Sequence, residues 1–255
     1  MDKTQQGSVK SVTKDQITTI TFYHPSHNSL PGNLLAALKE AIEQAGQSED
    51  SVLILLKSEG ERTFCAGASF NELVAISDDK SGKEFFSGFA NVINAIRKCP
   101  KLVIGRVQGK AVGGGVGIAA ACDYCMATKY ASAKLSELAV GIGPFVIGPA
   151  VERKVGLSAF SQMAINATEW QTAAWAKQKG LYTEVFETIQ QLDEYTAEFL
   201  KTLSSMNPIA MTELKKVFWE GTDHWDDLLA VRAEMSGKLV LSDFSKNAIS
   251  KFLTA

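Results

Sequence analysis

Two short runs of apolar side chains constrain the fold of this chain more than any other feature. Val52–Leu56 is one run, and Lys101–Val107 contains the other. Runs of this kind are typical of strands buried on both faces of a parallel sheet. Between them, apolar side chains recur at helical spacing from Phe85 to Ile96. Parallel strands joined by helices need crossover connections, so the sequence predicts an α/β fold.

Further elements follow the same order along the chain. Two short strands are expected within Gly7–Phe22, a helix within Leu34–Ala45 and another strand at Tyr124–Thr128. After about residue 186 the strand patterns stop, and the rest of the chain reads as amphipathic helices. The sequence therefore predicts an α/β body, residues 1–190, followed by a helical region, residues 191–255.

Composition excludes several classes of function. The 255 residues include 26 basic and 28 acidic side chains, for a net charge of −2, whereas nucleic-acid-binding proteins usually carry a basic stripe. No apolar segment is long enough to span a membrane, and the polar N-terminus lacks the apolar stretch of a secretory signal. We therefore expect a cytoplasmic protein with no nucleic-acid partner and no membrane contact.

The cysteines and histidines give no sign of a metal site. Only Cys122 and Cys125, of the four cysteines, are separated by two residues, and neither a second pair nor a histidine lies near them. His24 and His27 belong to a turn marked by proline. We expect no metal ligands, and we expect the cysteines to pack as small buried side chains.

Two segments rich in small residues are candidates for ligand binding. Phe64–Leu73 follows a buried strand, and Ala66, Gly67 and Ala68 have no bulky side chains to cover their backbone N–H groups. The second segment, Gly113–Gly117, opens a predicted helix, where free N–H groups and the helix dipole favour negative charge.

A dinucleotide site is an alternative interpretation of the second segment. Gly115, Gly117 and Ala120 match the loose glycine fingerprint of such sites. That fingerprint needs glycines directly after the strand and an acidic residue at the end of the next strand. Here five residues, 108–112, intervene, and the next strand leads into Lys129. These departures make the dinucleotide interpretation the weaker one.

Glu137 is the candidate acid or base. It precedes an apolar stretch punctuated by glycines, Leu138–Val151, that contains no other acid. Such surroundings raise the pKa of a carboxyl group toward the range useful for proton transfer. A cap on a surface turn is the alternative role.

Together these segments resemble the enoyl-CoA hydratase/isomerase, or crotonase, family. The matching segments are Phe64–Leu73, Gly109–Tyr124 and Leu135–Pro144. The resemblance implies a spiral of ββα repeats with a catalytic core over residues 1–190. It also implies that residues 191–255 form a C-terminal helical region used for trimerisation, with trimers that often pair into hexamers.

The resemblance also implies a substrate and the residues that bind it. The substrate is an acyl-CoA thioester, so CoA arrives with the substrate and no separate cofactor is expected. Ala68 and Gly114 correspond to the two N–H donors that hold the thioester carbonyl, and Ala66 corresponds to a backbone contact with adenine. Neighbouring positions expected to bind CoA or the acyl chain are Gly67, Gly115, Phe89 and Phe145. For Phe89 and Phe145, ordinary core packing is the alternative.

The number of carboxylates separates the reactions that the family performs. Hydratases of this family place a water between two glutamates, and the first of these positions is Gly117 here. A single glutamate, Glu137, favours double-bond isomerisation of an enoyl-CoA by a proton shuttle. Hydration of a 2-enoyl-CoA, as by an enoyl-CoA or methylglutaconyl-CoA hydratase, stays open because a second acid could come from elsewhere. Glu72, Asp78 and Asp79 are the nearest candidates. An acyl-CoA-binding protein without activity is the alternative of another class.

Overall fold

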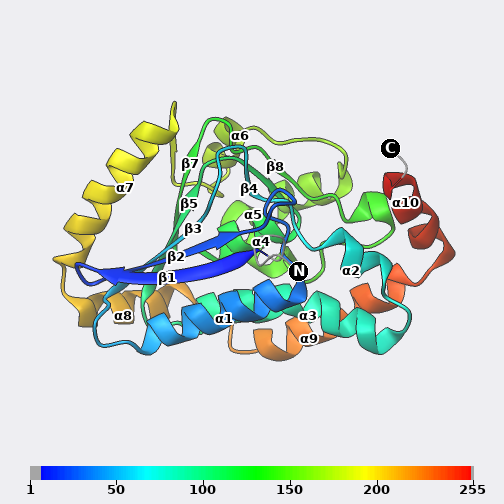
Figure 1. Cartoon of the computed structure of the whole chain (residues 1–255), viewed down its shortest axis with the longest axis horizontal. Helices are drawn as coiled ribbons and strands as arrows, with labels where there is room; N and C mark the ends of the chain where they lie inside the picture. The colour runs from blue at the N-terminus through cyan, green and yellow to red at the C-terminus, as the bar shows by residue number, and fades with distance from the viewer. Residues whose placement is uncertain (1–6, 254–255) are drawn as a thin grey trace.

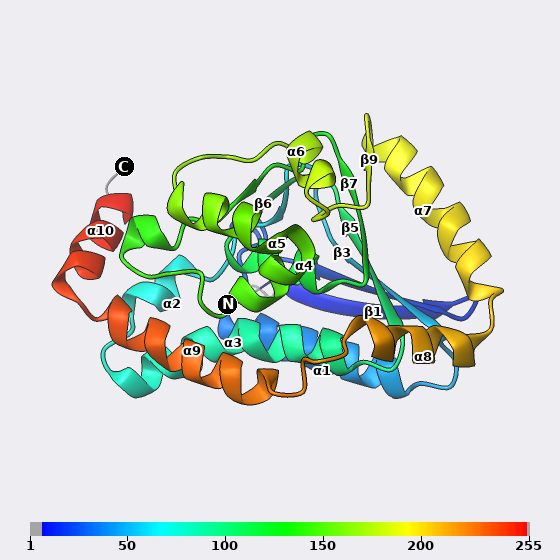
Figure 2. The same ribbon diagram turned by 180° about the vertical axis from the view of Figure 1, so that it is seen from behind.

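A computed structural model describes residues 7–253 of the chain. Residues 1–6, part of the polar segment from which we expect no secretory signal, lie outside the described residues. Figure 1 shows a large sheet with helices below it and to its left, and a smaller group of helices at the opposite end of the molecule. Figure 2 shows the same arrangement from behind.

The large sheet has six strands in the order β1-β2-β3-β5-β7-β9. Only β1 and β2 pair antiparallel, and every other neighbouring pair is parallel. Its strands are β1 (Ser8–Lys14), β2 (Ile17–Tyr23), β3 (Leu53–Ser58), β5 (Leu102–Val107), β7 (Tyr124–Thr128) and β9 (Glu184–Phe186). The two strands predicted from continuous apolar runs, β3 and β5, are central in this sheet, as expected for strands buried on both faces.

A second, parallel sheet contains β4, β6 and β8. Its strands are short: β4 (Thr63–Cys65), β6 (Lys110–Val112) and β8 (Ala133–Lys134). Successive strands alternate between the sheets, since β3, β5 and β7 enter the large sheet while β4, β6 and β8 enter the small one. Helices follow each of the pairs β3–β4, β5–β6 and β7–β8. The chain therefore repeats a ββα unit three times and turns as a spiral. This is the expected fold class.

Helices cover both faces of the large sheet. Those before β9 are α1 (Gly32–Gln47), α2 (Phe70–Val74), α3 (Asp79–Lys98), α4 (Gly114–Ala121), the short 3-10 helix η2 (Leu138–Val140), α5 (Gly148–Ile165) and α6 (Ala173–Gln178). The C-terminal helices are α7 (Ile189–Ser204), α8 (Pro208–Phe218), α9 (Trp225–Val240) and α10 (Asp243–Leu253). The helical region therefore begins two residues before the predicted position 191.

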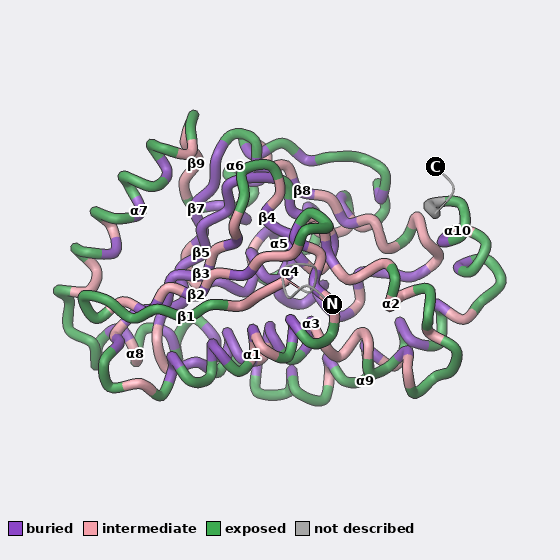
Figure 3. The backbone as a smooth tube through the Cα atoms, in the orientation of Figure 1, coloured by how far each residue is buried: buried purple, intermediate pink, exposed green. Residues whose placement is uncertain are grey.

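Alternate side chains of one strand enter two separate cores. Ile54 and Leu56 of β3 join the main core, which α1, α3, α4 and α5 enclose. Leu53 and Leu55 face the other way, toward Leu192 of α7 and other side chains of α7 and α8. Figure 3 shows the inner strands as almost continuously buried tubes, whereas the helices alternate between buried and exposed residues.

Two polar networks attach the C-terminal helices to the large sheet. In the first, Asp123 accepts hydrogen bonds from Lys215 Nζ at 2.9 Å and from Trp219 Nε1 at 2.8 Å, which fixes α8. The side chains of Asp123 and Lys215 are only 2% and 3% exposed, so this ion pair is buried. Breaking one partner of such a pair leaves an uncompensated buried charge.

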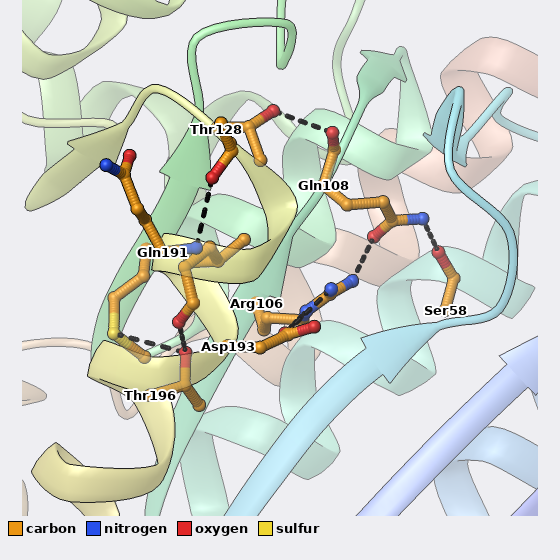
Figure 4. Close-up of polar contacts among 10 residues, drawn as sticks. Ser58, Arg106, Gln108, Thr128, Gln191, Asp193 and Thr196 are labelled. Atoms are coloured by element: carbon orange, nitrogen blue, oxygen red, sulfur yellow. Dashed lines mark hydrogen bonds and ion pairs between the residues drawn. The ribbon is translucent and has the colours of Figure 1, made fainter.

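The second network runs through the chain of contacts in Figure 4. Ser58 accepts a hydrogen bond from the Gln108 amide at 2.9 Å, and Gln108 Oε1 accepts one from Arg106 at 3.2 Å. Arg106 Nε donates in turn to Asp193 of α7 at 2.7 Å. This chain of contacts joins the ends of β3 and β5 to Asp193 in the N-terminal half of α7.

Several elements differ from the sequence-based expectation. Residues 58–68 and 109–113 are expected to be loops, but β4 and β6 form within them. Strands of three residues are too short to show an alternating pattern, and they gain their stability from pairing in the small sheet. Strand β9 and helices α5 and α6 are further elements that the sequence analysis does not predict.

No helix within residues 7–253 has the length and apolar character needed to cross a membrane.

All four cysteines are free and buried, as expected.

Candidate active site

A cavity of about 150 Å³ lies where the small sheet meets α3, α4 and α9. Segments far apart in the sequence contribute to its wall. The residues that line it are Ala66, Gly67, Ala68, Phe70, Leu73, Phe85, Phe86, Phe89, Val112, Gly113, Gly114, Ser136, Glu137, Val140, Ile142, Gly143, Pro144, Phe145, Val146, Ile147 and Ser236. Most of these side chains are apolar, and Glu137 is the one ionisable residue among them.

The turn after β2 positions the Ala68 loop. Leu30 forms an isolated parallel bridge with Ala68: its N–H donates to the Gly67 carbonyl at 2.8 Å, and its carbonyl accepts from Ser69 at 3.3 Å. In a parallel bridge these bonds use the groups that flank Ala68, so the Ala68 N–H points to the opposite side. Within residues 7–253 we find no protein acceptor for it.

Gly113 and Gly114 place a second free N–H beside the first. Gly113 has φ +51° and ψ −116°, a backbone conformation that favours glycine, and it turns the chain from β6 into α4. Gly114 is the first residue of α4, where N–H groups have no partner inside the helix. A Cβ atom on Gly114 would lie 2.2 Å from the Phe89 ring, so the aromatic ring packs directly on this backbone.

Glu137 lies opposite these groups, at the start of η2. Its Oε2 atom is buried and has no hydrogen-bond partner within residues 7–253. Burial raises the pKa of the carboxyl group from 4.5 to about 7, against a smaller lowering by backbone hydrogen bonds. A Cβ on Gly113 would lie 2.8 Å from Oε1, so the carboxyl group lies against the glycine turn. The role of a capping carboxylate is excluded, because η2 has no side-chain cap.

The turn that follows Glu137 is fixed by backbone bonds and by the last helix. The Glu137 carbonyl accepts hydrogen bonds from the N–H groups of Val140 at 3.2 Å and Ile142 at 3.1 Å. Phe244 and Ser245 of α10 then pack against Gly141. The C-terminal helix therefore supports the segment that carries the carboxylate.

The position of the second glutamate of hydratases is closed by packing. A Cβ atom on Gly117 would lie 2.6 Å from Cγ2 of Ile147. Ile147 is only 4% exposed and lines the cavity. Gly117 therefore lacks the acid, and a neighbouring aliphatic side chain fills the space that a side chain at this position would need.

The three candidates for a replacement acid do not line the cavity. Glu72 accepts a hydrogen bond from the backbone N–H of Gly32, at 2.8 Å, at the start of α1. Asp78 caps α3 through a reciprocal pair of bonds with Ser81. Asp79 lies in the first turn of the same helix. Glu72 and Asp78 therefore hold helix ends.

Most of the predicted site residues do meet at this cavity. Ala66, Gly67, Phe89 and Phe145 line it together with Ala68, Gly114 and Glu137. Gly115 is not among the lining residues: a Cβ there would lie 2.6 Å from the Cys65 carbonyl oxygen, so close helix packing explains this glycine. The N–H of Ala66 is donated to the His27 carbonyl at 3.2 Å.

The dinucleotide interpretation does not fit the structure. Helix α4 follows β6 of the small sheet, whereas the fingerprint requires glycines at the turn from a strand of the main parallel sheet into a helix.

Sequence reasoning missed Ile147 and Ser236. Ile147 follows the matched segment that ends at Pro144, and its contact with Gly117 spans 30 residues of sequence. Ser236 is an ordinary small residue within an amphipathic helix. Neither position carries a signal that could be recognised without the three-dimensional arrangement.

Comparison with known proteins agrees with this geometry. The family model described as "Enoyl-CoA hydratase/isomerase" matches residues 12–254. The chain belongs to the enoyl-CoA hydratase/isomerase family. This match spans nearly all of the chain and includes the three segments on which the resemblance rests.

Individual relatives carry the names of different reactions. A peroxisomal Delta(3,5)-Delta(2,4)-dienoyl-CoA isomerase from Arabidopsis thaliana is 26% identical over 95% of this chain and 91% of that protein. The mitochondrial methylglutaconyl-CoA hydratase from Homo sapiens is 30% identical over 77% of this chain and 58% of that protein. Family membership thus supports an enzyme that acts on acyl-CoA thioesters, and it does not choose between isomerisation and hydration.

Solved structures match the fold. The enoyl-CoA hydratase from Bacillus halodurans superimposes with a TM-score of 0.88 and 23% identity, covering 95% of this chain and 99% of that one. At this identity the match shows the crotonase fold and leaves the reaction open.

Proposed function

We propose that this protein is an enoyl-CoA isomerase in which Glu137 moves a proton between two carbons of the acyl chain. The observation that carries the proposal is the lone carboxyl group of the cavity, with Ile147 packed against the position where hydratases hold a second one. A single acid-base group suffices to take a proton and return it.

The free N–H groups of Ala68 and Gly114 support the same chemistry. Both residues line the cavity that Glu137 enters. Two preorganised donors stabilise the oxyanion that develops when a thioester loses an α-proton, and one such donor is typically worth about 2.7–4 kcal/mol of barrier. We assign them to the thioester carbonyl oxygen.

The reaction then proceeds in two proton transfers. The Glu137 carboxylate removes a proton from C2 of a 3-enoyl-CoA, and the C–H electron pair enters the conjugated enolate. The carboxylic acid formed on Glu137 delivers the same proton to C4, the double bond moves to C2–C3, and the carboxylate is restored. The reaction is redox neutral, so CoA, as part of the substrate, is the only nucleotide group that we expect at the site.

The environment of Glu137 suits both transfers. Burial raises its pKa to about 7, which makes it a stronger base than an ordinary carboxylate and a usable acid near neutral pH. The apolar wall around it limits competition from water.

Hydration of a 2-enoyl-CoA is the second candidate, and the names of several relatives favour it. That reaction needs a group to orient and deprotonate water. Glu72, Asp78 and Asp79 do not line the cavity, so the second acid would have to come from outside the described residues or from another subunit. A non-catalytic acyl-CoA-binding role is disfavoured because it gives no reason to bury an unpaired carboxyl group.

We also propose that the protein assembles as a homotrimer or as a dimer of trimers through its C-terminal helices. Large apolar side chains remain exposed on these helices, among them Val217 of α8 at 64% and Val231 of α9 at 60%. An interface between subunits would cover such side chains. Light scattering of the purified protein measures the number of subunits.

Incubation with a 3-enoyl-CoA and a 2-enoyl-CoA in water enriched in heavy oxygen tests the reaction. We expect the double bond to migrate without incorporation of label, and Glu137→Gln to slow the migration by about two to four orders of magnitude. Asp79→Asn, which alters an acid outside the cavity, serves as the matched control and should retain activity. Label in a 3-hydroxyacyl product would assign the protein as a hydratase, and full activity of Glu137→Gln would overturn the role of this residue.

A further inference from the structure

Ser236 is a buried hydroxyl that the proposed reaction does not use. The residue is 1% exposed and lines the cavity from α9, near the end of the chain. Within residues 7–253, its hydroxyl makes no hydrogen bond to another protein group. Several other helical serines bond a preceding carbonyl, as Ser87 does with Lys83 at 2.6 Å. The hydroxyl of Ser236 is thus free to meet a ligand in the cavity.

A close crossing of two helices brings this hydroxyl to the cavity. Helix α9 packs along α3, and Figure 2 shows the two side by side. At the crossing, a Cβ atom on Gly82 would lie 2.7 Å from the Cα atom of Gly237. The two glycines therefore allow the backbones of α3 and α9 to touch. Ser236, the neighbour of Gly237, lies in the cavity wall beside this crossing.

The surroundings of Ser236 offer its hydroxyl few protein partners. Phenylalanine side chains of α3, Phe85, Phe86 and Phe89, share the cavity wall with it. Among the described residues of the wall, the only other polar side chains are Ser136 and Glu137. A ligand oxygen in the cavity would therefore meet a hydroxyl that has no competing hydrogen-bond partner within residues 7–253.

The charge of the cavity restricts which ligand group fits. No cationic side chain belongs to the wall that the described residues form, and its one ionisable group is an acid. A carboxylate at the end of an acyl chain would be buried without a counter-charge, at high cost. A neutral oxygen, such as that of a hydroxyl group, would bond the serine without this cost.

The location of Ser236 places the contact away from the reacting carbons. Phe89 packs on Gly114, where we assign the thioester, and Gly82 marks the crossing beside Ser236. Seven residues of α3 separate Phe89 from Gly82, which corresponds to about 10 Å along the helix at 1.5 Å per residue. The crossing beside Ser236 thus lies about two turns of α3 from the residue that packs on Gly114, so we assign the serine to a part of the acyl chain beyond the reacting carbons.

From these observations we infer that Ser236 determines specificity by hydrogen bonding a neutral hydroxyl group carried on the acyl chain beyond the reacting carbons. The preferred substrates are then hydroxylated enoyl-CoA thioesters, with dicarboxylic chains excluded. This inference rests on the proposed function in one respect, because it assumes that the acyl chain occupies this cavity.

Two measurements on the full-length protein test the inference. The first is the binding of saturated acyl-CoA thioesters, which cannot isomerise, by titration calorimetry. Plain chains are compared with chains of equal length in which a hydroxyl moves outward one carbon at a time. The second is the ratio of kcat/KM for the corresponding hydroxylated and plain 3-enoyl-CoA thioesters. The variants are Ser236→Ala and, as a matched control, Ser250→Ala, which removes an exposed hydroxyl of α10.

We expect the wild-type protein and Ser250→Ala to bind the best hydroxylated chain about three- to tenfold more tightly than the plain chain, the amount expected for one hydrogen bond. Ser236→Ala should lose this preference and bind the plain chain as tightly as the wild type or more tightly. An equal affinity for both chains in the wild type would overturn the inference, as would a preference that persists in Ser236→Ala. Since the binding arm needs no turnover, absence of isomerisation would refute the proposed function alone.

Discussion

Replacing Glu137 by glutamine should make the protein more stable while it removes the activity. Burial raises the pKa of Glu137 from 4.5 to about 7, so the folded state holds this proton more tightly than the unfolded state does. The stability of the wild type therefore falls as the pH rises from about 4.5 to about 7, and it stays reduced above that. At about 1.4 kcal/mol for each pH unit, the loss amounts to about 3 kcal/mol.

The variant has no carboxyl group at this position, so it does not undergo this loss. Between pH 5 and pH 8 the free energy of unfolding of Glu137→Gln should rise by about 2–3 kcal/mol relative to that of the wild type. Urea unfolding at several pH values measures the difference. Turnover should fall by about two to four orders of magnitude, the usual contribution of a general acid-base group.

The exposed residue Glu84 offers a matched control on α3. Glu84→Gln should leave both the activity and the pH dependence of stability unchanged. If the stability difference between Glu137→Gln and the wild type were the same at pH 5 and pH 8, the carboxyl group would be solvated in the folded state. The argument from burial would then fail.

Three further results are expected. The kcat/KM of isomerisation should rise with pH and level off above a midpoint near pH 7, because the base must be ionised; a flat profile from pH 5 to 9 in a stopped assay would contradict this. Lys215→Met should lower the free energy of unfolding by about 3–5 kcal/mol, and adding Asp123→Asn should restore part of it, as measured by urea unfolding. Gly237→Ala should cost about 1–3 kcal/mol, because the new methyl group would lie 2.7 Å from the backbone of α3. An unchanged unfolding midpoint in that variant would show that the helices separate freely.

The larger elements could be predicted because their patterns are local. The strand Tyr124–Thr128 agrees with its expected bounds residue for residue, and β3 and β5 begin within one residue of theirs. Continuous apolar runs mark strands that are covered on both faces, whatever surrounds them. The sequence therefore contains enough information for the large sheet.

Elements stabilised by distant partners could not be predicted in this way. Strands β4 and β6 have three residues each, and they exist because they pair in the small sheet. Helix α5 buries Val151, Val155 and Ala159 at helical spacing, but Gly156 interrupts it with a φ of +77°. A glycine inside a helical pattern weakens the prediction of a helix.

In the candidate site, too, local features could be predicted and features that depend on distant contacts could not. Glu137 and the two glycine-containing loops could be predicted, because each is a contiguous segment with an unusual composition. The sequence could not show whether Glu72 or Asp78 reaches the cavity, because that depends on which helix end each carboxylate caps. The closure of Gly117 by Ile147 could not be predicted either, since it arises where two helices touch.

The crossing of α9 over α3 also determines when the cavity can be completed during synthesis of the chain. The last strand of the large sheet ends at Phe186, whereas Ser236 is added 50 residues later. At about 5–20 residues per second, the ribosome needs about 3–10 s for this interval. Until the final helices are made, Phe86 of α3 lacks Val240 of α9 and Ile249 of α10, which belong to the same apolar cluster in the finished fold.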